Sequence, residues 1–150
     1  MSHSYVSSLF HCIFSTKNRQ KIIIPPLQER LWPYLGGIAR ENDMKALAVG
    51  GIEDHVHLLI SLPATMNISK AMQLIKGGSS KWLHDEFPDQ REFAWQEGYG
   101  AFSIATSQID STKEYIANQV NHHAVKTFEE EFIAILNKHG IEYDPRYVWG

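Results

Sequence analysis

The residues in this chain best suited to chemistry are two histidines, His55 and His57, which flank one valine in the run DHVHLLI at positions 54–60. Strand side chains alternate between faces, so both imidazoles should project from the same face. The aliphatic residues around them predict a buried strand. Neutral imidazole is a common ligand of divalent metals, so the pair indicates two ligands of an incomplete metal site. The alternative is two core histidines satisfied by hydrogen bonds, because so short a pattern also arises by chance.

A second group of polar side chains lies on a predicted helix far downstream. Tyr115 and Gln119 are four residues apart and share one helix face, and His122 or His123 lies one turn further along. The core-facing side is expected to carry aliphatic residues, namely Ile116 and Val120. A tyrosine nucleophile needs a polarised electrophile, and a metal held by the two upstream histidines would polarise a phosphodiester. The alternative is a solvated helix face with a half-buried tyrosine.

The elements that must position these residues alternate in a regular order. Strands are predicted at 5–16, 44–50, 55–62 and 101–107, and helices at 27–42, from Asn67 or Ser69 to about 83, from Asp110 or Ser111 to about 123, and at 128–138. This order predicts an α+β, ferredoxin-like fold: a split βαβ antiparallel sheet with helices on one face, plus extra C-terminal helices. The first and third strands should form its central pair. Glycines at 77 and 78 are expected to interrupt the second helix.

Length and composition bound the class of protein. The chain has 150 residues and is 43% hydrophobic, so we expect a single domain over residues 1–150 with a real core. Cys12 is the only cysteine, which excludes an internal disulfide and a cysteine-based zinc site. We expect Cys12 to be a small core residue. A lone thiol, no signal peptide and no membrane-spanning stretch together predict a cytoplasmic protein.

Three motifs together carry a family resemblance. They are the run at 54–60, the run WQEGYGAFS at 95–103, and YIANQ at 115–119 with the two histidines at 122 and 123. The chain resembles the small single-tyrosine transposases of bacterial and archaeal insertion sequences and their REP-associated relatives. These proteins belong to the HUH (His-hydrophobic-His) endonuclease superfamily. The resemblance covers nearly the whole chain.

The resemblance implies a fold, a reaction and a set of roles. Proteins of this kind have a ferredoxin-like fold, act as homodimers whose sheets join, and bind hairpin ends of their element as single-stranded DNA. They cut and rejoin that DNA through a 5′-phosphotyrosine with Mg²⁺ or Mn²⁺. Carried over, His55, His57 and Gln119 are metal ligands and Tyr115 is the nucleophile, so these four are the expected catalytic residues. Whether Tyr115 serves its own histidines or those of a partner stays open.

The charge pattern argues in part against DNA binding. The formal net charge is −3, whereas nucleic-acid binders usually show a basic footprint. Local basic groups are nevertheless present at Lys17, Arg19, Lys21, Lys70, Lys76 and Lys81, and we predict that they form a positive DNA-binding surface. The acids at 129–131 predict a negative, solvated C-terminal helix. Trp95, Tyr99 and Phe102 would either stack on unpaired bases or pack in the core.

Two other functions compete with the transposase. One is a regulatory protein of the same fold that binds DNA hairpins without cutting them. The other is a metal-dependent phosphoesterase, for which the acidic residues do not group into a second metal cluster. Tyr115 standing together with both histidines and Gln119 favours the enzyme.

Overall fold

The computed structural model describes residues 3–149 and contains one four-stranded antiparallel sheet. Its strands are β1 (Leu9–Ser15), β2 (Lys45–Ile52), β3 (His55–Ser61) and β4 (Gly100–Ser103), in the order β2-β3-β1-β4. Its helices are α1 (Pro25–Glu41), α2 (Ile68–Glu86), α3 (Ile109–Ala117), α4 (Gln119–His122) and α5 (Phe128–Lys138). This confirms the ferredoxin-like arrangement with β1 and β3 as the central pair.

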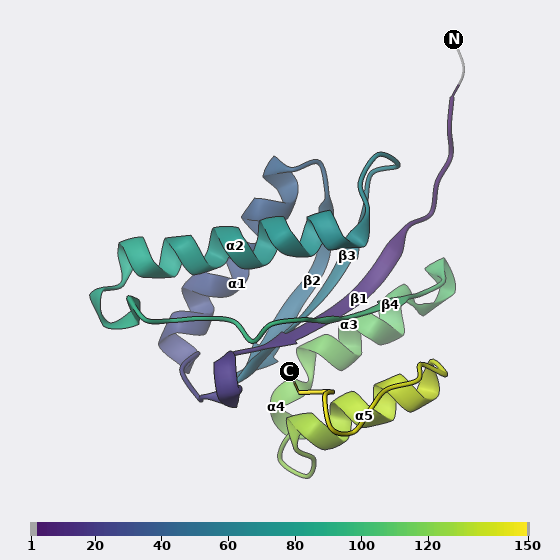
Figure 1. The fold of residues 1–150 in the computed structure, drawn as a ribbon. Helices are drawn as coiled ribbons and strands as arrows, with labels where there is room; N and C mark the ends of the chain where they lie inside the picture. Colours follow the sequence, from purple (N-terminus) through teal and green to yellow (C-terminus); the bar gives the residue numbers. More distant parts are fainter. Residues whose placement is uncertain (1–2, 150) are drawn as a thin grey trace.

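The two faces of the sheet carry different layers (Figure 1). One face packs against α1 and α2 around a core that contains Cys12, Phe14, Leu58 and Ile60. On the other face, α3 lies on β2. There α5 packs on β1 and β4 through a smaller cluster, called the aromatic cluster below, whose buried residues are Ile13, Phe102, Phe128 and Leu136. Cys12 is fully buried, as expected, and burial raises the pKa of its thiol.

The second helix is continuous, which corrects the expected interruption. Asn67 caps it, since its Oδ1 accepts a hydrogen bond from the Lys70 backbone N–H at 2.7 Å, and the helix runs through both glycines to Glu86. Gly78 lies against α1: a Cβ there would come within 3.1 Å of Ile38 Cδ1. Gly77 faces open space. One glycine therefore serves helix packing, and neither breaks the helix.

The C-terminal third differs from the prediction in its details. The fourth strand ends at Ser103, and α3 starts at Ile109 after a 3₁₀ turn, so Ser111 lies inside the helix and does not cap it. A break at Asn118 separates α3 from α4. Thr127 caps α5 with a capping box to Glu130.

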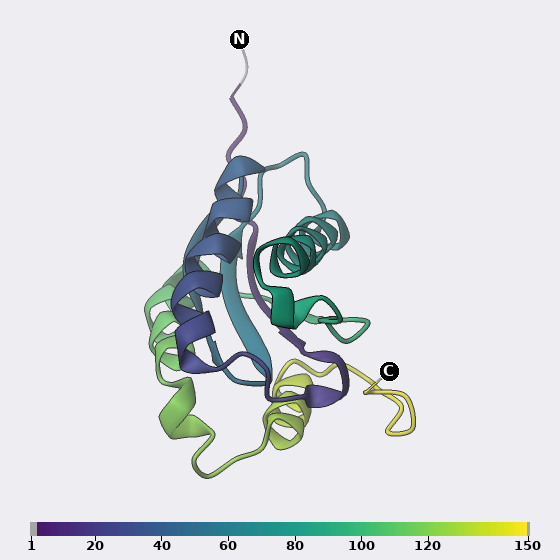
Figure 2. The same cartoon turned by 90° about the vertical axis from the view of Figure 1, so that its left-hand side faces the viewer.

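The tail after α5 folds back beside that helix (Figure 2), and its residues Tyr143, Val148 and Trp149 pack on the aromatic cluster. Residue 150 lies outside the described residues. The guanidinium of Arg19, in the turn after β1, lies 5.4 Å from the centroid of the Trp149 ring. Among residues 3–149, no helix combines the length and the apolar character needed to cross a membrane.

One row across the sheet positions the functional face. Gly50 on β2 pairs with His57 on β3, which pairs with Ile13 on β1, which pairs with Gly100 on β4. Side chains directly opposite one another on neighbouring strands share a face. The row therefore has a histidine and an isoleucine in the middle and a glycine at each end.

The two glycines let two helices approach the sheet closely. A Cβ on Gly50 would lie 2.7 Å from the Ile116 carbonyl oxygen of α3. A Cβ on Gly100 would lie 2.8 Å from Phe132 Cε2 of α5. With a side chain at Gly50, α3 could not approach β2 this closely, because the clashing atom is backbone; with a side chain at Gly100, the Phe132 ring would have to shift. Because the row has no side chain at either end, α3 packs closely at the Gly50 end and α5 at the Gly100 end, on either side of His57.

Candidate active site

Both histidines of β3 are fully buried on the face covered by α3 and α5. Each has its Nδ1 held by a neighbour. Nδ1 of His55 lies 2.7 Å from Asp54 Oδ1, and Nδ1 of His57 lies 2.8 Å from His11 Nε2. Their Nε2 atoms therefore point away from these supports and into the space under the helices. An imidazole whose second nitrogen is held in this way is typical of a metal ligand.

The helix after β4 brings its polar residues to the same place. Gln119 Oε1 lies 3.1 Å from His55 Nε2, and the Tyr115 ring centroid lies 5.7 Å from that of His57. The break at Asn118 changes which residues face inward. Gln119 is 1% exposed and Val120 is 70% exposed, so the predicted core position of Val120 is wrong. Ile116 is buried, as predicted.

A fifth residue, Glu131 on α5, stands at the centre of the cluster. Its Oε1 lies 3.0 Å from His57 Nε2 and 3.4 Å from His55 Nε2. Its Oε2 accepts hydrogen bonds from the Tyr115 hydroxyl and, at 3.2 Å, from the Gln119 amide. The prediction that Glu131 belongs to a solvated acidic run is wrong, because its side chain is 1% exposed.

Helical spacing is the signal that would have identified Glu131. The buried residues of α5 include Phe128 and Leu136, and Glu131 is three positions after the first and five before the second. Phe128 and Glu131 therefore share one helix face, whereas Glu129 and Glu130 point away from Phe128. A charge among the apolar positions of an amphipathic helix is therefore more informative than the length of an acidic run.

The two histidines left open by the sequence have different positions. Nε2 of His123 lies 3.2 Å from Glu131 Oε1 and 3.0 Å from Gln119 Oε1, and its Nδ1 lies 2.6 Å from the Lys126 carbonyl oxygen. His122 instead lies beside the tyrosine, with its Nε2 at 3.3 Å from the Tyr115 hydroxyl. His123 thus belongs to the group with His55, His57 and Glu131 whose ligand atoms could hold a metal ion, and His122 lies at the Tyr115 hydroxyl.

The buried ionisable groups of the cluster shift one another's pKa values. Burial alone would lower the pKa of His55, but hydrogen bonds to Asp54 and Glu131 outweigh it and raise that pKa to about 9. Burial lowers the pKa of His57 to about 4. The pKa of Glu131 lies well below its usual range, because the hydrogen bonds from His55 and His57 outweigh its burial. Burial, together with the negative charge of Glu131, raises the pKa of Tyr115.

The cluster opens to solvent through a cleft of about 400 Å³ beside α3 and α5. Tyr115, His122 and Glu131 line it, together with Lys126 and Lys138. These two lysines can offer positive charge to a phosphate that enters. A sheltered carboxylate, imidazole nitrogens, a tyrosine hydroxyl and two cations thus surround one opening.

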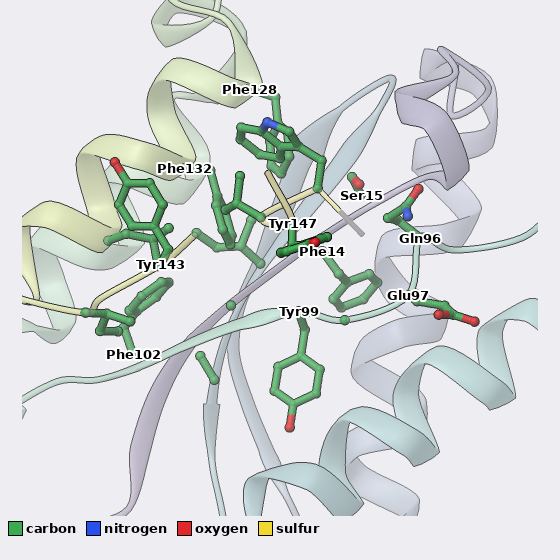
Figure 3. Close-up of a pocket in the computed structure, with 18 of the residues that line it drawn as sticks. Phe14, Ser15, Gln96, Glu97, Tyr99, Phe102, Phe128, Phe132, Tyr143 and Tyr147 are labelled. Atoms are coloured by element: carbon green, nitrogen blue, oxygen red, sulfur yellow. The ribbon is translucent and has the colours of Figure 1, made fainter. Parts of the chain in front are cut away.

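A larger cavity, of about 590 Å³, lies on the other side of α5 and does not include this cluster (Figure 3). Phe128, Phe132 and Tyr143 line one side of it, and Gln96 and Glu97 line the other. Its walls are mostly apolar and hold no group of converging ligands. We therefore assign the chemistry to the smaller cleft.

The basic and aromatic residues singled out by the sequence have mixed positions. Lys76 is half-buried and donates hydrogen bonds to the carbonyls of Gln96 and Gly98, so it clamps the loop before β4. Trp95 and Phe102 are buried and belong to the core rather than to a base-stacking surface. Tyr99 is 40% exposed.

Comparison with known proteins identifies the family. A family model described as IS200-like transposase matches residues 4–119. The chain belongs to the IS200-like transposase family. It is therefore related to proteins whose activity is DNA cleavage and strand transfer. The match contains His55, His57, Tyr115 and Gln119, and it ends before α5.

Curated relatives and solved structures agree with the family. The transposase of insertion sequence element IS200 from Salmonella typhimurium is 25% identical over 126 residues, covering 80% of this chain and 82% of the relative. The ISDra2 transposase TnpA from Deinococcus radiodurans is 25% identical over 121 residues, covering 77% of this chain and 86% of the relative.

Two solved structures share the fold of this IS200-like transposase. One, named as a candidate transposase from Deinococcus radiodurans R1, has a TM-score of 0.63 and 24% identity and covers 79% of this chain and 96% of its own. The other is a REP-associated tyrosine transposase bound to a REP hairpin, with a TM-score of 0.61 and 16% identity, covering 82% of this chain and 73% of its own.

Proposed function

We propose that this IS200-like transposase cuts and rejoins single-stranded DNA through a 5′-phosphotyrosine on Tyr115, with His55, His57 and Gln119 holding a divalent metal. The observation that carries the proposal is the convergence of a tyrosine hydroxyl and the imidazole pair on one carboxylate, that of Glu131, beside a solvent-open cleft that Tyr115 and Glu131 line. A tyrosine buried only for packing would not need a carboxylate and a histidine at its oxygen.

The residues present fit a metal. The ligand atoms of His55 and His57 lie within 4.8 Å of each other, Gln119 Oε1 lies 3.1 Å from His55 Nε2, and Asp54 and His11 hold the far sides of the two rings. Mg²⁺ and Mn²⁺ are the expected ions. Such an ion, when bound, polarises the scissile phosphate and neutralises charge on the leaving oxygen.

The chain itself supplies the nucleophile and the groups that accept the proton of that nucleophile. The Tyr115 oxygen forms a bond to the scissile phosphorus, and the bond from phosphorus to the 3′ oxygen breaks. The phenolic proton has two acceptors within hydrogen-bonding distance of the hydroxyl, Glu131 Oε2 and His122 Nε2. The 3′ oxygen leaves as a hydroxyl after it takes up a proton. Rejoining reverses these steps and needs no outside energy, because the phosphotyrosine keeps the bond.

The proposed substrate is a DNA hairpin with single-stranded flanks, which the hairpin bound by one structural neighbour supports. Tyr115 acts in cis in this proposal, since its hydroxyl contacts Glu131 of the same chain. Dimerisation, which the resemblance implies, would join two copies at a sheet edge, β2 or β4. It is not needed to bring the tyrosine to the histidines.

The test is incubation with labelled single-stranded DNA from the flanks of the protein's own gene, with Mn²⁺, followed by a denaturing gel and peptide mapping. We expect a covalent adduct at Tyr115 that is lost with EDTA and in Tyr115→Phe and His57→Ala. Tyr147→Phe is the matched control, because Tyr147 is 68% exposed and lines the other cavity rather than this cleft. Hairpin binding without an adduct would favour the regulatory protein, and cleavage without covalent attachment would favour the phosphoesterase.

A further inference from the structure

The helix α5 and the residues just before it lie beyond the segment matched by the family model, yet they reach the centre of the cluster. The match ends at residue 119, and both His123 and Glu131 come after it. Their ligand atoms and those of His55 and His57 all lie within 4.8 Å of one another. Two atoms bound to one ion at about 2.1 Å are at most about 4.2 Å apart, so a contraction of roughly half an ångström would bring all four onto one ion.

The hydrogen bonds show why this geometry calls for a cation. Nδ1 of His55 faces a carboxylate of Asp54, and Nδ1 of His123 faces the Lys126 carbonyl. Both of these partners only accept hydrogen bonds, so each Nδ1 carries its proton. In a neutral ring the Nε2 atom then presents a lone pair.

Several further polar atoms converge on these Nε2 positions. The Gln119 amide donates to Glu131 Oε2 and to the Tyr115 carbonyl, so its oxygen is turned toward His55 and His123. Glu131 Oε1 lies within 3.4 Å of three imidazole nitrogens. Oxygen and nitrogen atoms packed this closely need positive charge among them, which either protons on the imidazoles or a bound metal ion can supply.

We propose that His123 and Glu131 are ligands of the same metal ion as His55, His57 and Gln119. The donor set is then three imidazoles, one carboxylate oxygen and one amide oxygen. This inference rests on the metal site of the proposed function and extends it to α5. Imidazole ligands suit transition ions more than Mg²⁺, so the set favours Mn²⁺ over Mg²⁺. The other oxygen of Glu131 stays on the Tyr115 hydroxyl, so one carboxylate positions both the ion and the nucleophile.

The experiment measures Mn²⁺ binding directly, by isothermal titration calorimetry of the DNA-free protein. We expect Glu131→Gln and His123→Asn each to weaken Mn²⁺ affinity at least about 10-fold. Glu129→Gln is the matched control, because it removes an equal charge from the same helical turn at a 46% exposed side chain away from the cluster. It should bind Mn²⁺ as the wild type does.

Each outcome separates this inference from the proposed function. An affinity within about twofold of wild type in either Glu131→Gln or His123→Asn would overturn the five-ligand centre. His57→Ala tests the proposed function itself, because it should abolish binding whatever α5 contributes. Circular dichroism and thermal unfolding establish that each variant is folded, and if Glu131→Gln is not, His123→Asn still decides the outcome.

Discussion

Replacing Gly50 with alanine tests whether the missing side chain at this position on β2 is what allows α3, which carries Tyr115, to approach the histidines of β3. The new Cβ would lie 2.7 Å from the Ile116 carbonyl oxygen and 2.9 Å from its Cγ2, whereas ordinary contact starts at 3.4 Å. The carbonyl is backbone and cannot rotate away. α3 must therefore retreat from β2 by about 0.7 Å, the difference between 2.7 and 3.4 Å.

A shift of that size is large for a site assembled from 3 Å contacts. The Gln119 Oε1 to His55 Nε2 distance of 3.1 Å would lengthen to about 3.8 Å, beyond hydrogen-bonding range. Misplacing a reacting group by about 1 Å costs on the order of 100-fold in rate, so we expect adduct formation to slow about 10- to 100-fold. Overpacking of this kind should also cost about 1–3 kcal/mol of stability.

The assay is single-turnover formation of the Tyr115 adduct with labelled DNA and Mn²⁺, alongside urea unfolding. Gly77→Ala is the control, since a Cβ there meets nothing within 4 Å in the middle of α2. It should keep the wild-type rate and gain about 0.5–1 kcal/mol of stability. A Gly50→Ala protein as active and as stable as the wild type would refute the reasoning. If the wild type itself forms no adduct, the opposite stability changes of the two variants still test the packing.

Three further predictions concern the supports of the site. In EDTA, the free energy of unfolding should be greatest near pH 6.5. Below pH 6.5 the unfolded chain binds more protons than the folded one, because folding lowers the pKa of His57 to about 4 and of His11 to about 3, so stability is lost as the pH falls. Above pH 6.5 the folded chain binds more protons, because folding raises the pKa of His55 to about 9, so stability is lost as the pH rises. Urea unfolding from pH 4.5 to 9 should show slopes of about 1.4 kcal/mol per pH unit for each proton, and a monotonic rise would contradict this. His11→Phe removes the partner of His57 Nδ1 and should weaken Mn²⁺ binding about 10-fold by calorimetry; unchanged affinity would mean that His11 does not orient the ring. Lys76→Met removes two hydrogen bonds to the loop before β4 and should cost about 1–2 kcal/mol in urea unfolding, whereas Lys81→Met, at an exposed ion pair, should leave stability unchanged; equal effects would contradict the clamp.

The sequence predicted the parts of the site that follow from local periodicity. Alternation along β3 placed His55 and His57 on one buried face. Four-residue spacing predicted that Tyr115 and Gln119 lie together, and they do, although the break at Asn118 puts them on two helices, α3 and α4, rather than on one. The split βαβ order followed from the sequence of strand and helix patterns. These inferences need only the repeat of side-chain direction along a strand or a helix, and this repeat can be read from the local sequence alone.

What the sequence missed depends on how elements meet. Val120 was expected in the core, but the break at Asn118 turns it outward. His122 and His123 are neighbours in sequence, yet one contacts the Tyr115 hydroxyl and the other contacts Glu131 Oε1, a partner from a different helix. Glu131 joins the site across 74 residues from His57, and no local pattern links the two. Such long-range pairings are set by tertiary packing, which overrides composition.

The burial of Cys12 has a practical consequence for measuring motion in this molecule. Its side chain has no exposure, and burial raises the pKa of its thiol, so it will not react with thiol-directed dyes in the folded protein. A single cysteine introduced at the 87% exposed Val125, in the link before α5, would carry a fluorophore alone without any need to replace Cys12. Fluorescence from that one position would then report, in real time, whether the link moves when metal or DNA arrives.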